Sequence, residues 1–401
     1  MKPDIDQKIS HLLTHQVADV IVRESLEKKL RSGRKLRIKL GADPSRPDLH
    51  IGHAVLLRKL RAFQDLGHEV VFLIGDFTAK IGDPTGKSKA RPMLSDKEIK
   101  ENAKTYLKQV GKVLDVKKVE VRYNSEWLGK MKAVDFVSLC ASFTVARIIE
   151  RDDFKKRLAS GTDVHMHELL YPMLQAYDSI ALKTDVEIGA TDQTFNMLAG
   201  RALMSKKGMI PQDVMTTEIL VGTDGKEKMS KSLGNTIGVM DSADEMFGKT
   251  MSVPDFALDN WLELAADYTK EEIGQEKAAL KKGENPRDVK MRLAKRLVAM
   301  YHGAKATDDA EASFKARFQK GEMPSPDTLK IFVVDGVRTS TEVVAKAFGL
   351  SNSQARRDIE SGGVKIDGKK IDDPSMEIRP PEKGSILQKG KLYFVRLMKK
   401  K

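Results

Sequence analysis

Short apolar runs alternate with longer amphipathic segments along the first part of the chain. Residues 36–40, 69–76 and 119–123 are apolar and β-rich, which predicts buried strands. Between them, apolar side chains recur at helical spacing, for example from Ser95 onward, where Ser95 and Glu98 match a capping box. Strands that alternate with helices predict an α/β fold built on a doubly wound parallel sheet.

The same pattern continues on either side of these runs. Apolar spacing predicts helix over residues 5–32 and again over 169–178. Short strands are predicted at 186–188 and 218–221, with a helix over 192–204 between them. The strands at 186–188 and 218–221 are therefore expected to complete the sheet.

Pattern and composition divide the 401 residues into three expected domains. Residues 1–240 carry the α/β pattern, interrupted at about 127–165 by a helical, charged insertion. Residues 241–323 are helical and highly charged, and Pro-Ser-Pro at 324–326 marks a linker. Residues 331–401 are expected to form a small α+β unit, and they hold 15 Lys and Arg against 9 Asp and Glu.

Composition narrows the possible functions. The single cysteine, Cys140, excludes an internal disulfide framework. The sequence lacks an apolar signal segment and any run near the ~20 residues that cross a bilayer, so we expect a soluble, cytoplasmic protein without membrane contact. The net charge of +13 makes nucleic acid a candidate partner.

Two histidines mark the first candidate site. His50 and His53 stand at the turn between the strand over 36–40 and the next helix. Open α/β sheets bind ligands at such turns, and a helix N-terminus favours anions. Taken alone, the pair is also compatible with an incidental surface pair or a metal site.

A second loop superficially resembles a phosphate-binding P-loop. It ends in Gly-Lys-Ser at 86–88, but only three residues separate Gly82 from Gly86 where a P-loop has four. The P-loop interpretation therefore fails, and Asp83 and Lys87 remain as groups able to hold an ammonium and a phosphate.

A lysine-rich stretch far downstream complements the histidine pair. Residues 228–232, Lys-Met-Ser-Lys-Ser, place two ammonium groups and two hydroxyls on a Gly-flanked loop, which suits contact with moving phosphates. With His50 and His53 upstream, this stretch resembles the paired signatures of class I aminoacyl-tRNA synthetases. The metal interpretation of the histidines is then set aside.

The middle of the chain resembles the tyrosyl-tRNA synthetase family, in one bacterial subtype. The segments that carry the resemblance are 41–45, 171–178 and 189–193, and residues 353–368 resemble an S4 RNA-binding domain. Tryptophanyl-tRNA synthetase is one alternative, and a non-catalytic RNA-binding protein on the same fold is another.

The resemblance implies a role for each matching position. Asp178 would accept a hydrogen bond from the substrate phenol. The other residues implied in tyrosine binding are Asp83, Asn124, Tyr171, Gln175 and Gln193. Those implied in ATP binding are Gly52, Gly189, Asp192, Lys228, Ser230 and Lys231. Those implied in catalysis, by stabilising the phosphates, are His50, His53, Lys87, Arg91, Lys228 and Lys231. Those implied in RNA binding are Arg356, Arg357 and Lys365.

The resemblance also implies the reactants and the assembly. Tyrosine, ATP with Mg²⁺, and tRNA(Tyr) are expected, with no tightly bound cofactor and no protein-held metal. A homodimer is expected, with its interface at residues 127–165. The chain departs from the better-known subtype at Lys39 and Leu40, where that subtype has a tyrosine that recognises the phenol and then a cysteine. Lys39 is expected either to balance the charge of Asp178 or to point elsewhere.

Overall fold

The computed structural model describes residues 5–85, 94–319, 326, 329–380, 382–390 and 393–400, the side chains of 317–319 excepted. The chain forms two compact units, Met1–Gly303 and Ala304–Lys401. The finer division expected near residues 240 and 323 stays a prediction. None of the helices in the described ranges is both long and apolar enough to span a membrane.

A six-stranded sheet in the order β1-β6-β5-β2-β3-β4 forms the centre of the first unit. Its strands are β1 (Asp19–Ile21), β2 (Arg37–Ala42), β3 (Glu69–Ile74), β4 (Val119–Tyr123), β5 (Val186–Ala190) and β6 (Asp213–Thr217). Strands β2 to β6 are parallel, and β1 pairs with β6 in the antiparallel direction. The predicted doubly wound sheet is thus confirmed, with an antiparallel strand added at one edge.

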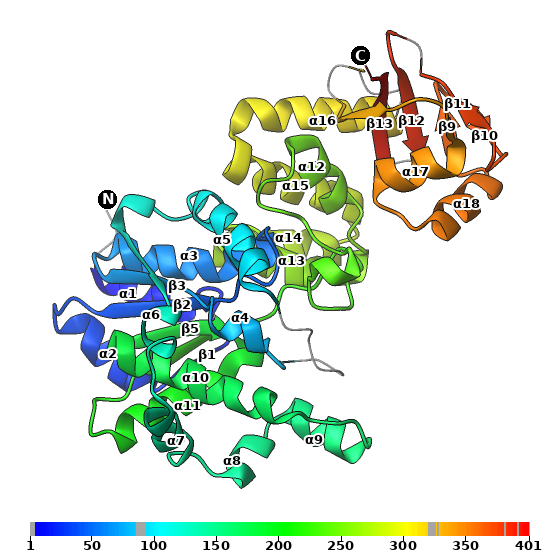
Figure 1. The fold of residues 1–401 in the computed structure, drawn as a ribbon. Helices are drawn as coiled ribbons and strands as arrows, with labels where there is room; N and C mark the ends of the chain where they lie inside the picture. Colours follow the sequence, from blue (N-terminus) through cyan, green and yellow to red (C-terminus); the bar gives the residue numbers. More distant parts are fainter. Residues whose placement is uncertain are drawn as a thin grey trace. The chain divides into compact units, whose positions relative to one another are not determined.

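Helices cover both faces of this sheet (Figure 1). They are α1 (Ile5–Thr14), α2 (Arg23–Arg31), α3 (Ile51–Asp65), α5 (Asp96–Val110), α10 (Met166–Leu182) and α11 (Thr194–Lys206). The predicted capping box is present: Ser95 accepts from the Glu98 backbone N–H, and the Glu98 side chain accepts from that of Ser95. The local sequence pattern therefore predicted the start of α5 correctly.

Two local predictions are wrong. Residues 5–32 do not form continuous helix, because β1 separates α1 from α2 and takes its hydrogen bonds from β6. The strand predicted at 218–221 lies earlier, as β6, and residues 218–220 have no regular structure. In both places, pairing with a distant strand outweighed the local apolar pattern.

The remaining helices of the first unit fall into two groups along the chain. The predicted helical insertion contains α6 (Ser125–Leu128), α7 (Ala133–Cys140), α8 (Val145–Ile149) and α9 (Asp152–Ala159). Towards the end of the unit follow α12 (Ala243–Met251), α13 (Leu258–Leu264), α14 (Lys270–Lys281) and α15 (Pro286–His302). The short elements are α4 (Thr78–Ile81), η1 (Val116–Lys118), η2 (Thr191–Gln193), η3 (Lys231–Leu233) and η4 (Asp255–Ala257).

The second unit begins with α16 (Ala304–Gln319), and two helices, α17 (Ser340–Phe348) and α18 (Asn352–Glu360), pack with small sheets. Its strands are β7 (Ile331–Val334), β8 (Arg338–Thr339), β9 (Val364–Ile366), β10 (Lys369–Ile371), β11 (Glu377–Ile378), β12 (Ser385–Lys389) and β13 (Tyr393–Lys399). Val344, Ile359 and Leu387 are fully buried between helices and strands. This is the predicted α+β unit. Of the predicted linker at 324–326, only Pro326 lies among the described residues.

Candidate active site

Main-chain pairing brings the two signature stretches together. His50 bridges to Gly238, the Ile51 N–H donates to the Ile237 carbonyl at 2.9 Å, and the Val239 N–H donates to the Leu49 carbonyl at 3.1 Å. The segment after the lysine-rich stretch is thereby fixed beside the N-terminus of α3. Two stretches almost 180 residues apart in sequence form one site.

The two histidines lie against each other at this helix start. Their ring centroids are 3.9 Å apart, and Nδ1 of His53 accepts from the His50 backbone N–H at 3.2 Å. Burial, together with the nearby Lys228, lowers the pKa of His53 to about 4, and burial also lowers that of His50. Both rings are therefore neutral near pH 7, and the buried Nδ1 of His50 has no hydrogen-bond partner.

The two lysines of the second stretch form ion pairs across the site. Lys228 pairs with Asp192, and Lys231 pairs with Asp48, just upstream of the histidines. Lys228 and Asp192, both predicted to contact ATP, thus lie together. The second carboxylate oxygen of Asp192 is buried and has no partner.

Close packing explains the glycines predicted at the ATP site. A Cβ added at Gly52 would lie 3.0 Å from Nδ1 of His50, and one at Gly189 would lie 2.8 Å from Sδ of Met197. Ser230, between the two lysines, donates its backbone N–H to Oδ1 of Asn235 at 2.7 Å. The loop is therefore held by its own side chains.

Asp178 lies at the buried end of a second cluster, on α10. Its carboxylate accepts from Nε1 of Trp127 at 2.8 Å and from Nδ2 of Asn124 at 3.3 Å. Burial raises the pKa of Asp178 to about 7, although Lys39 and both donors oppose this. The group is therefore a buried hydrogen-bond acceptor held by two donors.

Lys39 is buried and forms its ion pair with Glu187, its register partner on β5. Its Nζ lies 2.9 Å from Oε1 of Glu187 and donates to Oγ of Ser179 at 2.8 Å. Gln175, predicted to contact tyrosine, donates to the same Glu187 oxygen at 3.1 Å. Lys39 therefore points mainly at Glu187. Its positive charge also partly offsets the rise in the pKa of Asp178 that burial causes.

Tyr171 connects α10 to the end of β2. Its hydroxyl donates to Oδ2 of Asp43 at 2.9 Å, and Thr78 donates to Oδ1 of the same carboxylate at 2.8 Å. Burial raises the pKa of Tyr171 well above its ordinary value, so the phenol stays protonated.

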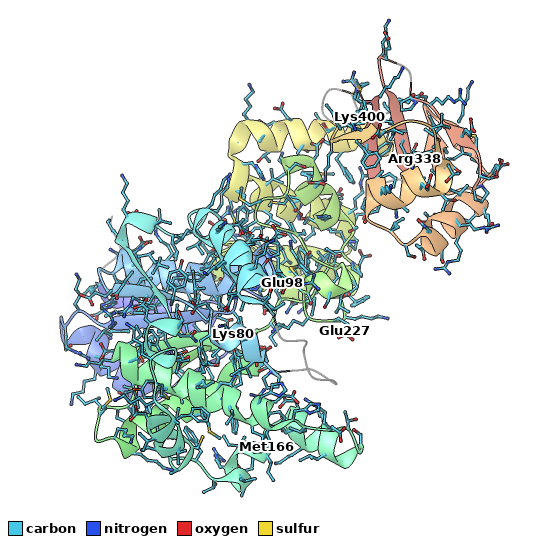
Figure 2. The ribbon with its side chains drawn as sticks, viewed as in Figure 1. Lys80, Glu98, Met166, Glu227, Arg338 and Lys400 are labelled. Atoms are coloured by element: carbon cyan, nitrogen blue, oxygen red, sulfur yellow. The ribbon has the colours of Figure 1, made fainter. Side chains whose placement is uncertain are left out.

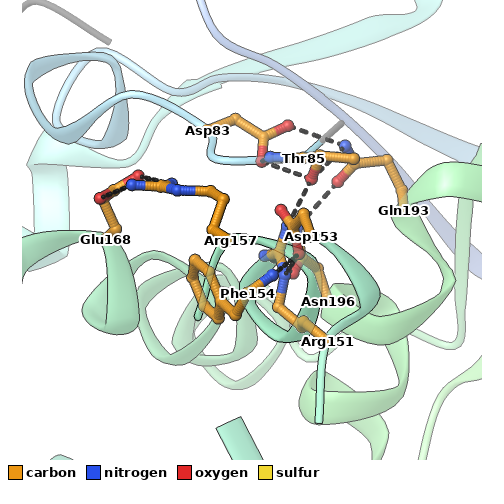
Figure 3. A network of polar contacts seen from close by, with 9 residues as sticks. All are labelled: Asp83, Thr85, Arg151, Asp153, Phe154, Arg157, Glu168, Gln193 and Asn196. Carbon is orange, nitrogen blue, oxygen red and sulfur yellow. Dashed lines mark hydrogen bonds and ion pairs between the residues drawn. The ribbon is translucent and has the colours of Figure 1, made fainter. Parts of the chain in front are cut away.

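Asp83 and Gln193 meet directly, with Nε2 of Gln193 donating to Oδ2 of Asp83 at 2.8 Å (Figure 3). Thr85 donates both its backbone N–H, at 2.9 Å, and its hydroxyl, at 2.5 Å, to Oδ1 of Asp83. Lys87 and Arg91, predicted to stabilise phosphates, lie outside the described residues.

The candidate RNA-binding residues lie in the second unit. Arg356 is exposed on α18 and pairs with Glu360, Arg357 donates to Gln354 at 2.7 Å, and Lys365 lies on β9. They are spread over one helix and one strand, and within the part of the chain that the structure describes no hydrogen bond or ion pair joins them to one another.

Several site residues escaped sequence reasoning, namely Asp43, Trp127, Arg151, Glu187 and Asn196. Trp127 and Asp43 stand beside or inside stretches that the resemblance singled out, so local context was the available signal. Glu187, in an otherwise apolar strand, was a buried-charge signal that pointed to a cationic partner. Arg151 had no comparable signal, because Thr85 and Asn196, the site residues to which it donates, are distant in sequence.

Comparison with known proteins identifies the family. The family model described as tRNA synthetases class I (W and Y) matches residues 31–319, and the S4 domain model matches residues 342–382. Tyrosine–tRNA ligase of Geobacter metallireducens is 50% identical, over 94% of both chains, and that of Dehalococcoides mccartyi is 48% identical, over 97% of this chain and 98% of the other.

Solved structures agree on the fold. The tyrosyl-tRNA synthetase of Archaeoglobus fulgidus, complexed with L-tyrosine, covers 77% of this chain and all of its own, with a TM-score of 0.62 at 23% identity. The mitochondrial enzyme of Aspergillus nidulans covers 78% of this chain and 94% of its own, with a TM-score of 0.63 at 21% identity. The chain therefore belongs to the tyrosine–tRNA ligase family of class I aminoacyl-tRNA synthetases and carries an S4 domain over residues 342–382.

Proposed function

We propose that this chain attaches tyrosine to tRNA(Tyr) in two steps. A carboxylate oxygen of tyrosine attacks the α-phosphorus of ATP, and the bond to the leaving pyrophosphate breaks. A hydroxyl of the 3′-terminal ribose of tRNA then attacks the tyrosyl carbonyl, and AMP leaves. The observation that carries this proposal is the main-chain pairing of the histidine and lysine stretches, in a unit that also holds the buried carboxylate of Asp178.

The ATP side of the site follows from the charges. Neutral His50 and His53 donate ring N–H groups to phosphate oxygens, and Lys228 and Lys231 neutralise the charge that grows on the pyrophosphate. The ATP ribose takes the Asp192 carboxylate, which frees Lys228 from its ion pair. Gly52 and Gly189 allow close approach of the nucleotide.

Two further cations and a metal ion complete the phosphate environment. Lys87 and Arg91 are proposed to close over the same phosphates. Mg²⁺ enters with ATP as its phosphate complex, because this small, hard cation prefers phosphate and water oxygens to a protein cage.

The tyrosine side uses polar groups at both ends of the substrate. Asp178, oriented by Asn124, accepts the phenol hydrogen bond. Asp83, Tyr171 and Gln175 surround the α-ammonium group, and Gln193 lies near the carboxylate. The hydrogen bonds of Asp83 give the clearest support for binding of the α-ammonium group. Three donors occupy its two oxygens, and since a carboxylate has about four acceptor positions, one remains for a ligand.

The S4 domain, proposed to extend over residues 331–401, binds tRNA through phosphate contacts from Arg356, Arg357 and Lys365. The boundaries 1–240 and 241–323 are proposed for the catalytic and helical domains, and the cytoplasm is the proposed location.

A homodimer is proposed through the insertion at residues 127–165. Two large apolar side chains of the insertion, Val134 and Val145, are each 70% exposed, and Met166, directly after it, is 75% exposed. Figure 2 labels Met166 on this helical region. Burial against a second copy would remove these side chains from water.

Charging of purified tRNA(Tyr) with labelled tyrosine tests the proposed function. We expect tyrosyl-tRNA to form only when ATP, Mg²⁺ and tRNA(Tyr) are all present. Charging of tRNA(Trp) with tryptophan, or no charging of either tRNA by a folded protein, would contradict the proposal.

A further inference from the structure

Arg151, the residue that precedes α9, closes a ring of hydrogen bonds around the Asp83–Gln193 pair (Figure 3). Its Nη2 donates to Oγ1 of Thr85 at 2.9 Å, and its Nη1 donates to Oδ1 of Asn196 at 2.8 Å. Nδ2 of Asn196 in turn donates to Oε1 of Gln193 at 2.9 Å. Both arms of the guanidinium thus lead to the same carboxylate, that of Asp83.

The guanidinium itself has little freedom. Its Nε and Nη2 donate to the two oxygens of Asp153, at 3.0 and 2.9 Å, and it lies 4.9 Å from the ring centre of Phe154. Arg151 is 5% exposed and Asn196 is 1% exposed. The ring of bonds is therefore largely shielded from water. In such a buried environment each hydrogen bond is stronger, and each unpaired polar group costs more free energy, than in water.

The direction of every bond in this ring follows from Arg151. An arginine can only donate, so Asn196 must turn its oxygen towards it and its NH₂ group towards Gln193. Gln193 must then present its carbonyl to Asn196 and its NH₂ group to Asp83. Thr85 accepts from Arg151 and gives its single hydroxyl hydrogen to Asp83.

We propose that Arg151 is a positioning residue for the amino-acid site, where it fixes through Asn196 and Thr85 the orientation of Gln193 and Asp83. The proposal rests on the proposed function, in which Asp83 receives the α-ammonium group of tyrosine. With the ring intact, three donors hold the carboxylate so that its remaining acceptor position is fixed in direction. Without Arg151 the amides of Asn196 and Gln193 are free to turn, and a carbonyl then faces Asp83.

Two variants break the ring in different ways. Arg151→Lys keeps the charge beside Asp153, but a single ammonium lacks the planar fork that reaches Thr85 and Asn196 together. Asn196→Asp keeps the bond to Arg151 and even adds an ion pair, but it removes the NH₂ group that faces Gln193. Gln193 then turns its own NH₂ group away from Asp83.

Arg157→Lys is the matched control. Arg157 lies on α9, which Arg151 precedes; it is 3% exposed and donates to Glu168 through two bonds of 2.6 and 2.9 Å. Figure 3 shows this pair beside the ring, and none of its bonds given for the described residues involves Asp83, Thr85, Gln193 or Asn196. It reports the general cost of disturbing a buried arginine of the insertion.

Calorimetric binding of three ligands to the full-length protein tests the proposal. Tyramine keeps the ammonium and the phenol, 4-ethylphenol keeps the phenol alone, and tyrosine keeps the phenol, the ammonium and the carboxylate. We expect Arg151→Lys and Asn196→Asp to weaken tyrosine and tyramine about tenfold or more, because misplacement of a positioned group has effects of this size. Both ring variants should bind 4-ethylphenol as tightly as the wild type does, because it contacts neither Asp83 nor Gln193, and Arg157→Lys should bind all three ligands normally.

The proposal is overturned if Asn196→Asp leaves tyramine binding unchanged, since Arg151 then only supports the fold. It is equally overturned if all three ligands weaken together, or if Arg157→Lys matches the ring variants. A wild-type protein that binds tyramine and tyrosine but charges no tRNA contradicts the proposed function and leaves the role of Arg151 measurable.

Discussion

The buried carboxylate of Asp178 is expected to lower the stability of the folded protein when it is ionised, although the same group is proposed to bind the substrate phenol. Its pKa rises from the ordinary value of 3.8 to about 7 in the folded protein, mainly through burial. Since the folded state favours the protonated form, the destabilisation is absent below pH 3.8, grows as the pH rises, and is complete above pH 7. At 1.36 kcal/mol per unit, the full effect is about 4 kcal/mol.

Asp178→Asn removes this ionisation. The variant should gain stability relative to the wild type by about 3 kcal/mol between pH 5 and pH 8, on the same two pKa values. An opposite, pH-independent loss of about 1–3 kcal/mol is expected, because the new NH₂ group faces Trp127 or Asn124 where an acceptor is needed. Only the change with pH therefore reports the buried charge.

Thermal unfolding at pH 5 and pH 8 measures this difference. The Tm of the variant minus that of the wild type should rise from pH 5 to pH 8. Asp65→Asn removes an exposed carboxylate and serves as the control, with no such rise. Tyrosine should bind the Asp178→Asn variant about tenfold or more weakly, because a charge-assisted hydrogen bond is lost. A difference in Tm that does not change with pH, or unchanged tyrosine binding, would refute the role assigned to Asp178.

Three further changes test other parts of the site. Lys39→Met should destabilise the first unit by about 3–5 kcal/mol, because it leaves the buried Glu187 without its ion pair. Adding Glu187→Gln should restore most of the lost stability, as measured by thermal unfolding. A double variant that is no more stable than Lys39→Met would contradict this. Lys231→Ala should slow adenylate formation in single-turnover assays about 10-fold or more while tyrosine affinity stays constant, and normal rates would exclude the residue from the chemistry. Arg356→Gln combined with Arg357→Gln should weaken tRNA binding and reduce its salt dependence, with pyrophosphate exchange unaffected, whereas an equal loss of both activities would argue against a tRNA-binding role.

The strand-to-helix turn before α3 and the helix α10 were predictable, because their apolar periodicity and turn residues act locally. The family signatures at His50 and Lys228 were predictable for a different reason, since the two stretches occur together although each alone is ambiguous. What the sequence could not show is how Lys228 meets Asp192, because that contact depends on the fold bringing residue 228 to η2, which follows β5.

Long-range pairing accounts for the rest of what was missed. Strand β1 lies in a segment with helical periodicity, and only β6 makes it a strand. Glu187 and Lys39 were each visible as charges in apolar strands, but their pairing depends on the register of β5 against β2. The ring around Arg151 joins three segments of the chain, so only the folded structure brings its members together.

Amino-acid-dependent exchange of pyrophosphate into ATP tests most directly whether this site activates tyrosine. With purified full-length protein and Mg²⁺, we expect exchange with tyrosine and none with tryptophan, and loss of most of the exchange in Asp178→Asn. Exchange supported by tryptophan and not by tyrosine, or no exchange with any amino acid, would contradict the assignment.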